Sequence, residues 1–170
     1  GWVKYGLNLP AGGHIRATGI VPCGQNCGSS SIVRAVAPFG QLPNIVVTES
    51  GTPVHTGYTY DFGAIKTSAS LADVRFDIQN TGAGVLTGLK SVTLEDDPTH
   101  PGDDTTQFEL TRPSSDTLAA GGTASIYVTF KPRTALTHKV ILHLVSNDPD
   151  ESPININLQG FGGEPIATWR

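Results

Sequence analysis

The sequence predicts an all-β protein with the architecture of a β-sandwich. Near the C-terminus, three segments alternate apolar and polar side chains with a period of two, so one face of each strand is buried and the other is wetter. Clusters of Gly, Pro, Asn and Asp separate these segments as turns, and no segment shows a convincing helical pattern. Short strands divided by such turns are typical of a sandwich. The three segments are Thr123–Phe130, His138–Ser146 and Pro153–Gly160.

Residues 1–43 form an extended N-terminal region that differs from the rest of the chain. They are rich in Gly and Pro and carry only short apolar runs. The segment Trp2–Leu9 has a strand pattern, and further strands are expected at Ile15–Val21 and Ser31–Ala37. These pieces cannot build a compact core alone, so we expect them to pack on the main domain or on another molecule. The apolar side chains that alternate in the first segment are Val3, Tyr5, Leu7 and Leu9.

The strand signals recur regularly after this region, so we place the main domain at residues 44–163 and a C-terminal tail at residues 164–170. The expected strands are Ile45–Thr48, Tyr58–Phe62, Ala72–Gln79, Leu86–Leu94, Gln107–Thr111, Thr123–Phe130, Lys139–Ser146 and Ile154–Gln159. Their inward-facing side chains should form one core. Its expected members are Val74, Phe76, Ile78, Ile126, Val128, Phe130, Val140, Leu142, Leu144, Ile154, Ile156 and Leu158.

Composition narrows the functional classes. Only 15% of residues are charged, which is low for a globular domain, and the formal net charge is −4. No basic stripe supports nucleic-acid binding, and no apolar run approaches 18 residues, so we expect no membrane insertion. The chain starts at Gly1 and contains no Met. We therefore expect a processed, exported protein, extracellular or at the cell surface, with a fragment of a longer protein as the alternative.

Two cysteines, Cys23 and Cys27, are separated by three intervening residues in a Gly-containing loop. Zinc would need four ligands, and a redox C-x-x-C motif has two intervening residues. We expect an intrachain disulfide, which suits an oxidising compartment, and keep free thiols and metal binding as alternatives.

Five short motifs together resemble a known family. They are Asp61–Gly63, Phe76–Gly82, Leu118–Pro132, Ser146–Pro153 and Leu158–Gly160. In combination, over residues 44–163, the chain is similar to the Hydin-type (ASH) immunoglobulin-like domain in its bacterial form, found in choice-of-anchor surface proteins. The resemblance implies an immunoglobulin-like β-sandwich of seven to eight strands that serves as a structural or adhesive module, with no family-wide catalytic residues.

Two acidic segments are candidate cation sites. Glu95-Asp-Asp97 with Asp103-Asp104 could bind calcium through carboxylate oxygens, but the spacing matches no EF-hand, and a solvated loop is the favoured reading. The same reading applies to the turn that contains Asp148, Asp150 and Glu151. Asn80-Thr-Gly82 and the Asn147-Asp148 pair are expected to be folding devices, because their side chains can accept backbone hydrogen bonds in turns.

No catalytic constellation is evident. None of the five histidines sits in a metal-binding motif, and no Ser occupies a G-x-S-x-G turn. We therefore expect no enzymatic activity, no catalytic residue, no cofactor and no metal. The histidines are His14, His55, His100, His138 and His143. Large aromatics could stack on sugar rings, although packing or interface contact is favoured. They are Trp2, Trp169, Tyr58 and Tyr60.

These observations favour a self-assembling extracellular structural protein, the subunit of a filament or surface layer, whose partner is another copy of itself. Strand exchange by the N-terminal region would join the subunits. Ile141 and Val145 make their strand apolar on both faces, so a second cover is expected there. The expected interface residues are Trp2, Val3, Tyr5, Leu7, Leu9, Ile141, Val145 and Trp169. The alternative is an adhesion module that binds a surface glycan; a cytosolic or ciliary adaptor is disfavoured by the Cys loop and the low charge.

The disulfide prediction is tested by the mass of the unreduced protein. We expect Cys23 and Cys27 to be bonded within one chain. Because the enclosed loop is short, the bond should stabilise the fold by only about 2 kcal/mol. The intact mass should be two hydrogens below that of the reduced protein. Two thiols that react with iodoacetamide in the native protein would contradict the bond.

Overall fold

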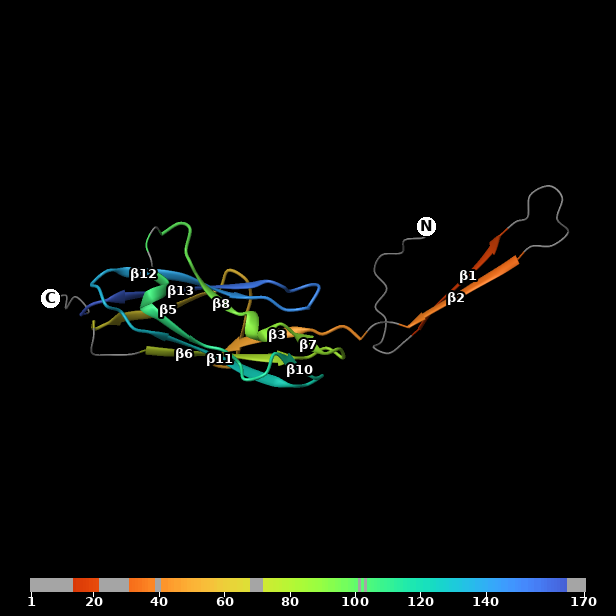
Figure 1. Ribbon diagram of the computed structural model, residues 1–170, viewed down its shortest axis with the longest axis horizontal. Coiled ribbons are helices and arrows are strands. Elements are labelled where there is room, and N and C mark those ends of the chain that lie inside the picture. The colour runs from red at the N-terminus through yellow and green to blue at the C-terminus, as the bar shows by residue number, and fades with distance from the viewer. Residues whose placement is uncertain are drawn as a thin grey trace. The chain divides into compact units, whose positions relative to one another are not determined.

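The computed structural model divides the chain into two units, residues 1–41 and residues 42–170, each of which we describe by itself (Figure 1). The described residues are 14–21, 31–38, 41–67, 72–100, 102 and 104–164, the first two ranges by backbone alone. In the described part of the chain, neither short helix has the length and apolar character that crossing a membrane requires.

The first unit contains one β-hairpin. Strand β1 (His14–Val21) pairs antiparallel with β2 (Ser31–Pro38), and the register runs from His14 opposite Pro38 to Val21 opposite Ser31. Both strands were expected from the sequence, but their pairing was not. Cys23 and Cys27 fall between the two strands in the sequence, and the segment Trp2–Leu9 precedes them. All of these residues lie outside the described part of the chain. Their predicted roles therefore stay predictions.

The second unit is a sandwich of two sheets, which confirms the all-β prediction. The first sheet has the order β4 (Thr52–Val54), β3 (Ile45–Glu49), β6 (Ala72–Asn80), β11 (Thr123–Phe130) and β9 (Phe108–Thr111). The second has the order β5 (Thr59–Ile65), β13 (Ile154–Gly162), β12 (Thr137–Leu144) and β8 (Thr93–Asp96). A short ribbon pairs β7 (Leu86–Thr87) with β10 (Thr117–Leu118).

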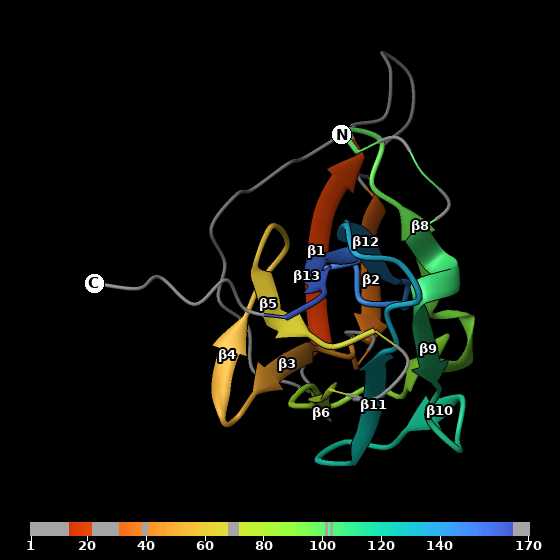
Figure 2. The same cartoon turned by 90° about the vertical axis from the view of Figure 1, so that its left-hand side faces the viewer.

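The first part of this unit contributes to both sheets. β3 pairs antiparallel with β6 in the first sheet, and after β4 the chain crosses over, so that β5 pairs parallel with β13 in the second. Figure 2 shows β3, β4 and β5 at one edge of the sandwich and β8 and β9 at the opposite edge. This order is that of an immunoglobulin-like sandwich, in which the four-stranded sheet faces the five-stranded sheet.

One core fills the space between the sheets. Every core side chain expected from the alternation is buried in a single cluster, so that prediction is confirmed. Phe130 stands at its centre with no exposed surface, and its ring centroid lies 4.8 Å from that of Phe108 and 5.5 Å from that of Phe62. Gly160 lies against this ring: a Cβ at that position would come within 2.5 Å of it. Packing, not backbone freedom, therefore requires the glycine.

The strand predicted at Leu86–Leu94 is wrong. The segment is instead β7, a 3-10 turn η1 (Leu89–Ser91) and β8. Gly88 has a φ of 93°, a left-handed conformation that ends β7. Leu86, Leu89 and Val92 are all fully buried, so the apolar spacing is three and not two. Strands β4 and β10 escaped prediction because they are too short to alternate, and Gln107 belongs to a second 3-10 turn, η2 (Asp104–Gln107).

Truncation of Phe130 tests the core. We expect Phe130→Ala to lower the free energy of unfolding by about 3–5 kcal/mol, because the ring leaves a cavity that the surrounding side chains cannot fill. Tyr127 lies on the same strand but is 42% exposed, and Tyr127→Ala is the matched control. Its cost should stay below about 1 kcal/mol in urea denaturation. Similar losses for both variants would contradict this account of the core.

Candidate functional site

A buried amide fixes the turn after β6. Asn80 is fully buried, and its Oδ1 accepts the N–H groups of Asn44 at 3.2 Å and of Gly82 at 3.1 Å. Its Nδ2 donates to the carbonyl oxygens of Gly84 and Leu118. The amide thus uses both its donors and both lone pairs of its oxygen. Asn80 is the folding device that the sequence predicted and not a ligand site.

A buried carboxylate likewise fixes the turn between β12 and β13. Oδ2 of Asp148 accepts the N–H of Ile45 at 2.7 Å, and Oδ1 accepts those of Asp150 and Glu151. Burial of Asp148 favours the protonated form, but these backbone bonds outweigh it and lower the pKa. Asp148, which is 3% exposed, is therefore the folding device that the sequence predicted, whereas the solvated-loop prediction is wrong for it because backbone N–H groups replace water.

In the acidic segment after β8, other protein groups likewise contact a buried carboxylate. Asp104 is buried: its Oδ1 lies 2.6 Å from Nδ1 of His138, and its Oδ2 accepts the N–H of Lys139 at 2.9 Å. Nδ1 of His100 lies 3.0 Å from the same Oδ2. Burial raises the pKa of Asp104, but the hydrogen bonds from His138 and Lys139 outweigh it, so the pKa is lowered.

Two further carboxylates of this segment also accept hydrogen bonds from the protein. Oδ1 of Asp96 accepts the N–H groups of Asp104 and Thr105, and Oδ1 of Asp97 accepts the N–H and the hydroxyl of Thr99. Within the described residues, no group of three or more His, Cys, Asp or Glu side chains could hold a metal ion. The solvated-loop prediction is again wrong for Asp104, because imidazole and backbone donors surround it.

His138 is a buried polar residue whose burial the sequence did not predict. It is 3% exposed, and its Nε2 lies 3.0 Å from Oγ1 of Thr134 and 3.4 Å from the carbonyl oxygen of Thr134. Hydroxyl, imidazole and carboxylate thus follow the order of a nucleophilic triad, although the ring is buried against Phe130. A signal was present: His138 lies two residues before Val140 and shares its inward phase.

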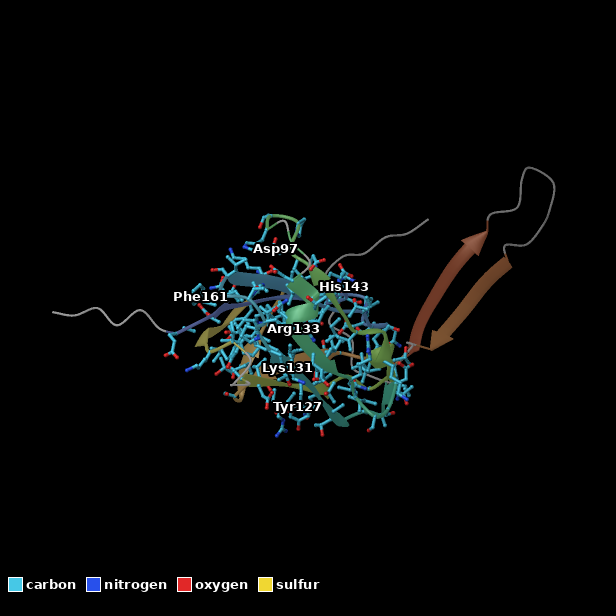
Figure 3. All side chains as sticks on the ribbon, turned by 60° about the vertical axis from the view of Figure 1, so that its left-hand side comes forward. Asp97, Tyr127, Lys131, Arg133, His143 and Phe161 are labelled. Carbon is cyan, nitrogen blue, oxygen red and sulfur yellow. The ribbon has the colours of Figure 1, made fainter. Side chains whose placement is uncertain are left out.

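Two of the predicted interface residues lie on the outer face, which we define as the outward side chains of β12 and β13 and the start of the turn that follows β12. Ile141 is half-buried in a shallow groove of about 380 Å³ with Lys139, Asn157 and Gln159. Val145 is 39% exposed. Figure 3 shows His143 and Asp97 on the opposite side of the sandwich from Tyr127. The two-sided apolar pattern is real, and the cover over it stays a prediction.

The aromatic candidates separate into two groups. Tyr58 and Tyr60 pack against the core, and the Tyr60 ring lies 4.9 Å from that of Phe62. Burial, then the nearby Glu49 carboxylate, raises the pKa of Tyr60. Packing, the favoured interpretation of these aromatics, therefore accounts for both tyrosines. Trp2 and Trp169 lie outside the described residues, as do Val3, Tyr5, Leu7 and Leu9, so the interface role of these six stays a prediction.

A second groove opens between the two sheets, and we call it the edge groove. It encloses about 340 Å³ between β3 and β4 on one side and residues 150–154 on the other. Ile45, Val47, Val54 and Ile154 line it and belong to the core cluster. Exposed His55, Asp150 and Glu151 are also part of its lining. The sequence does not predict this groove, because its walls come from segments about a hundred residues apart.

No protein-family model matches the chain, and no curated protein matches it. Solved structures do resemble it. A protein of unknown function from Porphyromonas gingivalis W83 is 16% identical with a TM-score of 0.52, covering 92% of this chain and 68% of its own. The ASH / PapD-like domain 7 of human CEP192 is 14% identical with a TM-score of 0.46, covering 71% and 86%. The N-terminal domain of PorA is 19% identical with a TM-score of 0.40, covering 71% and 100%. At these identities the likeness concerns the fold alone.

The buried carboxylate of Asp104 predicts a pH dependence of stability. Because its pKa is lowered in the folded protein, its stabilising effect is present above the ordinary carboxyl pKa and is lost as pH falls through the lowered value. We expect Asp104→Asn to cost about 2–3 kcal/mol at neutral pH, and the difference from the unsubstituted protein to shrink below about pH 4. Urea denaturation at several pH values measures both. Asp73→Asn, at an exposed position, is the control, and a gap that widened on acidification would contradict the assignment.

Proposed function

We propose that this protein is an extracellular or cell-surface structural module that assembles with copies of itself through its N-terminal region. One observation carries the proposal. Among the described strands, β1 and β2 pair only with each other, as a sheet of two strands. An isolated two-stranded hairpin is at best marginally stable in water, because it has no second layer to bury its side chains against. The hairpin therefore needs a surface, and a neighbouring copy offers one.

The distribution of charge supports contact between unlike parts of two copies. Residues 1–41 carry three Lys or Arg and no Asp or Glu. The rest of the chain carries eight Lys or Arg against all 15 Asp and Glu. Complementary charge favours encounter between a basic region on one copy and an acidic domain on the next. Such a heterologous contact does not close on itself unless its rotation allows a ring, so it builds filaments or layers.

The sandwich supplies a rigid acceptor. Its edge strands are β4, β5, β8 and β9, and β5 is the longest with 7 residues. An edge strand leaves backbone groups unpaired, which makes it a template for strand addition. The alternating Val3, Tyr5, Leu7 and Leu9 give the N-terminal segment the pattern of a strand that could be donated. The resemblance to the bacterial Hydin-type domain supports the same structural role and a surface location.

Adhesion through a glycan is the second candidate. The outer-face groove carries polar groups that suit sugar hydroxyls, from Lys139, Asn157 and Gln159, around the apolar Ile141. A glycan that binds there should lose affinity on Asn157→Ala, measured by calorimetry, without any change in assembly.

Substitutions on the two opposite faces of the N-terminal segment test assembly. We expect Tyr5→Ser with Leu7→Ser to abolish polymers, because both apolar side chains leave the interface, as should deletion of residues 1–9. Gly6→Ser with Asn8→Ser changes the other face of the same segment and should leave assembly intact. Analytical ultracentrifugation and electron microscopy measure the polymer, and circular dichroism checks the fold.

Two outcomes would reject assembly through this segment. One is a chain that still polymerises after deletion of residues 1–9. The other is a truncated chain that unfolds as a monomer, since the segment would then belong to its own domain.

A further inference from the structure

The edge groove gives access to the hydrophobic core from outside. Ile45, Val47, Val54 and Ile154 are 2–5% exposed, whereas Phe76, Ile126 and Phe130 at the centre of the core have no exposed surface. The four therefore form an apolar floor between the two sheets. An apolar side chain placed on that floor would extend the core and leave water, which is favourable in proportion to the area buried.

The described wall of the groove is negatively charged. Asp150 and Glu151 are exposed there, and no Lys or Arg lies among the lining residues that the structure describes. A hydrogen bond with Asp148 and burial, followed by the charges of Asp148 and Asp150, raise the pKa of Glu151. The groove thus combines an apolar floor with a negative potential, which suits an apolar segment that carries a cation.

Residues 1–13 have this chemistry and enough length. They contain the alternating apolar side chains and Lys4, with no acidic residue. Thirteen extended residues span about 45 Å, which exceeds the diameter of about 35 Å expected for a domain of this size. The segment of one copy can therefore reach the edge of the next.

Building on the proposed self-assembly, we infer that the edge groove is the acceptor site for the segment Trp2–Leu9 of a neighbouring copy. Apolar side chains of that segment enter between the sheets, and the basic N-terminal region lies over Asp150 and Glu151. Side-chain insertion dominates over strand pairing at this edge. The flanking strand β4 has 3 residues, and Pro53 at its centre has no N–H to donate.

Photo-crosslinking in the full chain tests the site. Tyr5 is replaced by p-benzoylphenylalanine, an aromatic residue that bonds to nearby C–H groups on illumination, in a mixture of isotopically heavy and light copies. Mass spectrometry of the digest then reports both the attachment site and whether heavy and light peptides are joined. We expect mixed crosslinks to residues 45–47, 53–56 or 150–154.

Each alternative outcome overturns the acceptor site, the proposed function or both. Mixed crosslinks elsewhere, for example around Ile141, overturn the edge groove as acceptor and leave self-assembly standing. Crosslinks only within one copy show that the segment docks on its own domain, which overturns both the acceptor site and the proposed function. Polymers without any crosslink overturn the acceptor site alone, and a monomer in sedimentation overturns the proposed function.

Charge reversal provides a second measurement that does not disturb the groove floor. Asp150→Lys with Glu151→Lys should raise the concentration at which assembly begins by about tenfold, because the basic segment now meets like charge. Asp73→Lys with Glu95→Lys reverses two exposed acids outside the groove and changes the net charge equally. This control should shift the concentration by less than about twofold. Equal shifts would assign the effect to net charge and overturn the site.

Discussion

Two neighbouring backbone N–H groups at the start of the domain connect its entry point to both sheets of the sandwich. The N–H of Asn44 donates to Asn80, which ends β6 in the first sheet, and the N–H of Ile45 donates to Asp148, in the turn that joins two strands of the second. Both acceptors are buried, so each bond would be costly to lose. The point at which the chain enters is thereby tied to both sheets at once, and the later crossing from β4 to β5 starts from a fixed position.

Side chains that alternate could be predicted, and side chains that leave the alternation could not. Phe76, Phe130 and Leu142 lie in strands long enough for a period of two to be unambiguous, and all three are buried as expected. Leu86 and Leu89 belong to a segment that turns at Gly88, where apolar residues first recur every three positions, up to Val92, and then after two, at Leu94. Only the packing of the whole sandwich decides between a strand and a 3-10 turn there.

Charge patterns were the weaker guide to the candidate site. An acidic run has the same sequence whether water or backbone N–H groups solvate it, so the burial of Asp104 and Asp148 depends on residues far away in the chain, His138 and Ile45. The edge groove illustrates the same limit, because Val54 and Ile154, which both line it, belong to strands of different sheets. Ile141 could be placed on an outer face from its own strand, since the alternation there is local.

The same tether has a mechanical consequence. Asn44 is held where β6 ends, whereas Gly162 leaves β13 beside Ile65 and Leu136, at the other end of the eight-residue strand β11 (Figure 1). A pull between Leu42 and Glu164 therefore runs along the strands. Interstrand hydrogen bonds lie across the strands, so a lengthwise force strains the bonds of β3 and of β13 together and does not open them one after another. Rupture in this direction requires many bonds to fail at once, which makes the fold suited to bearing tension.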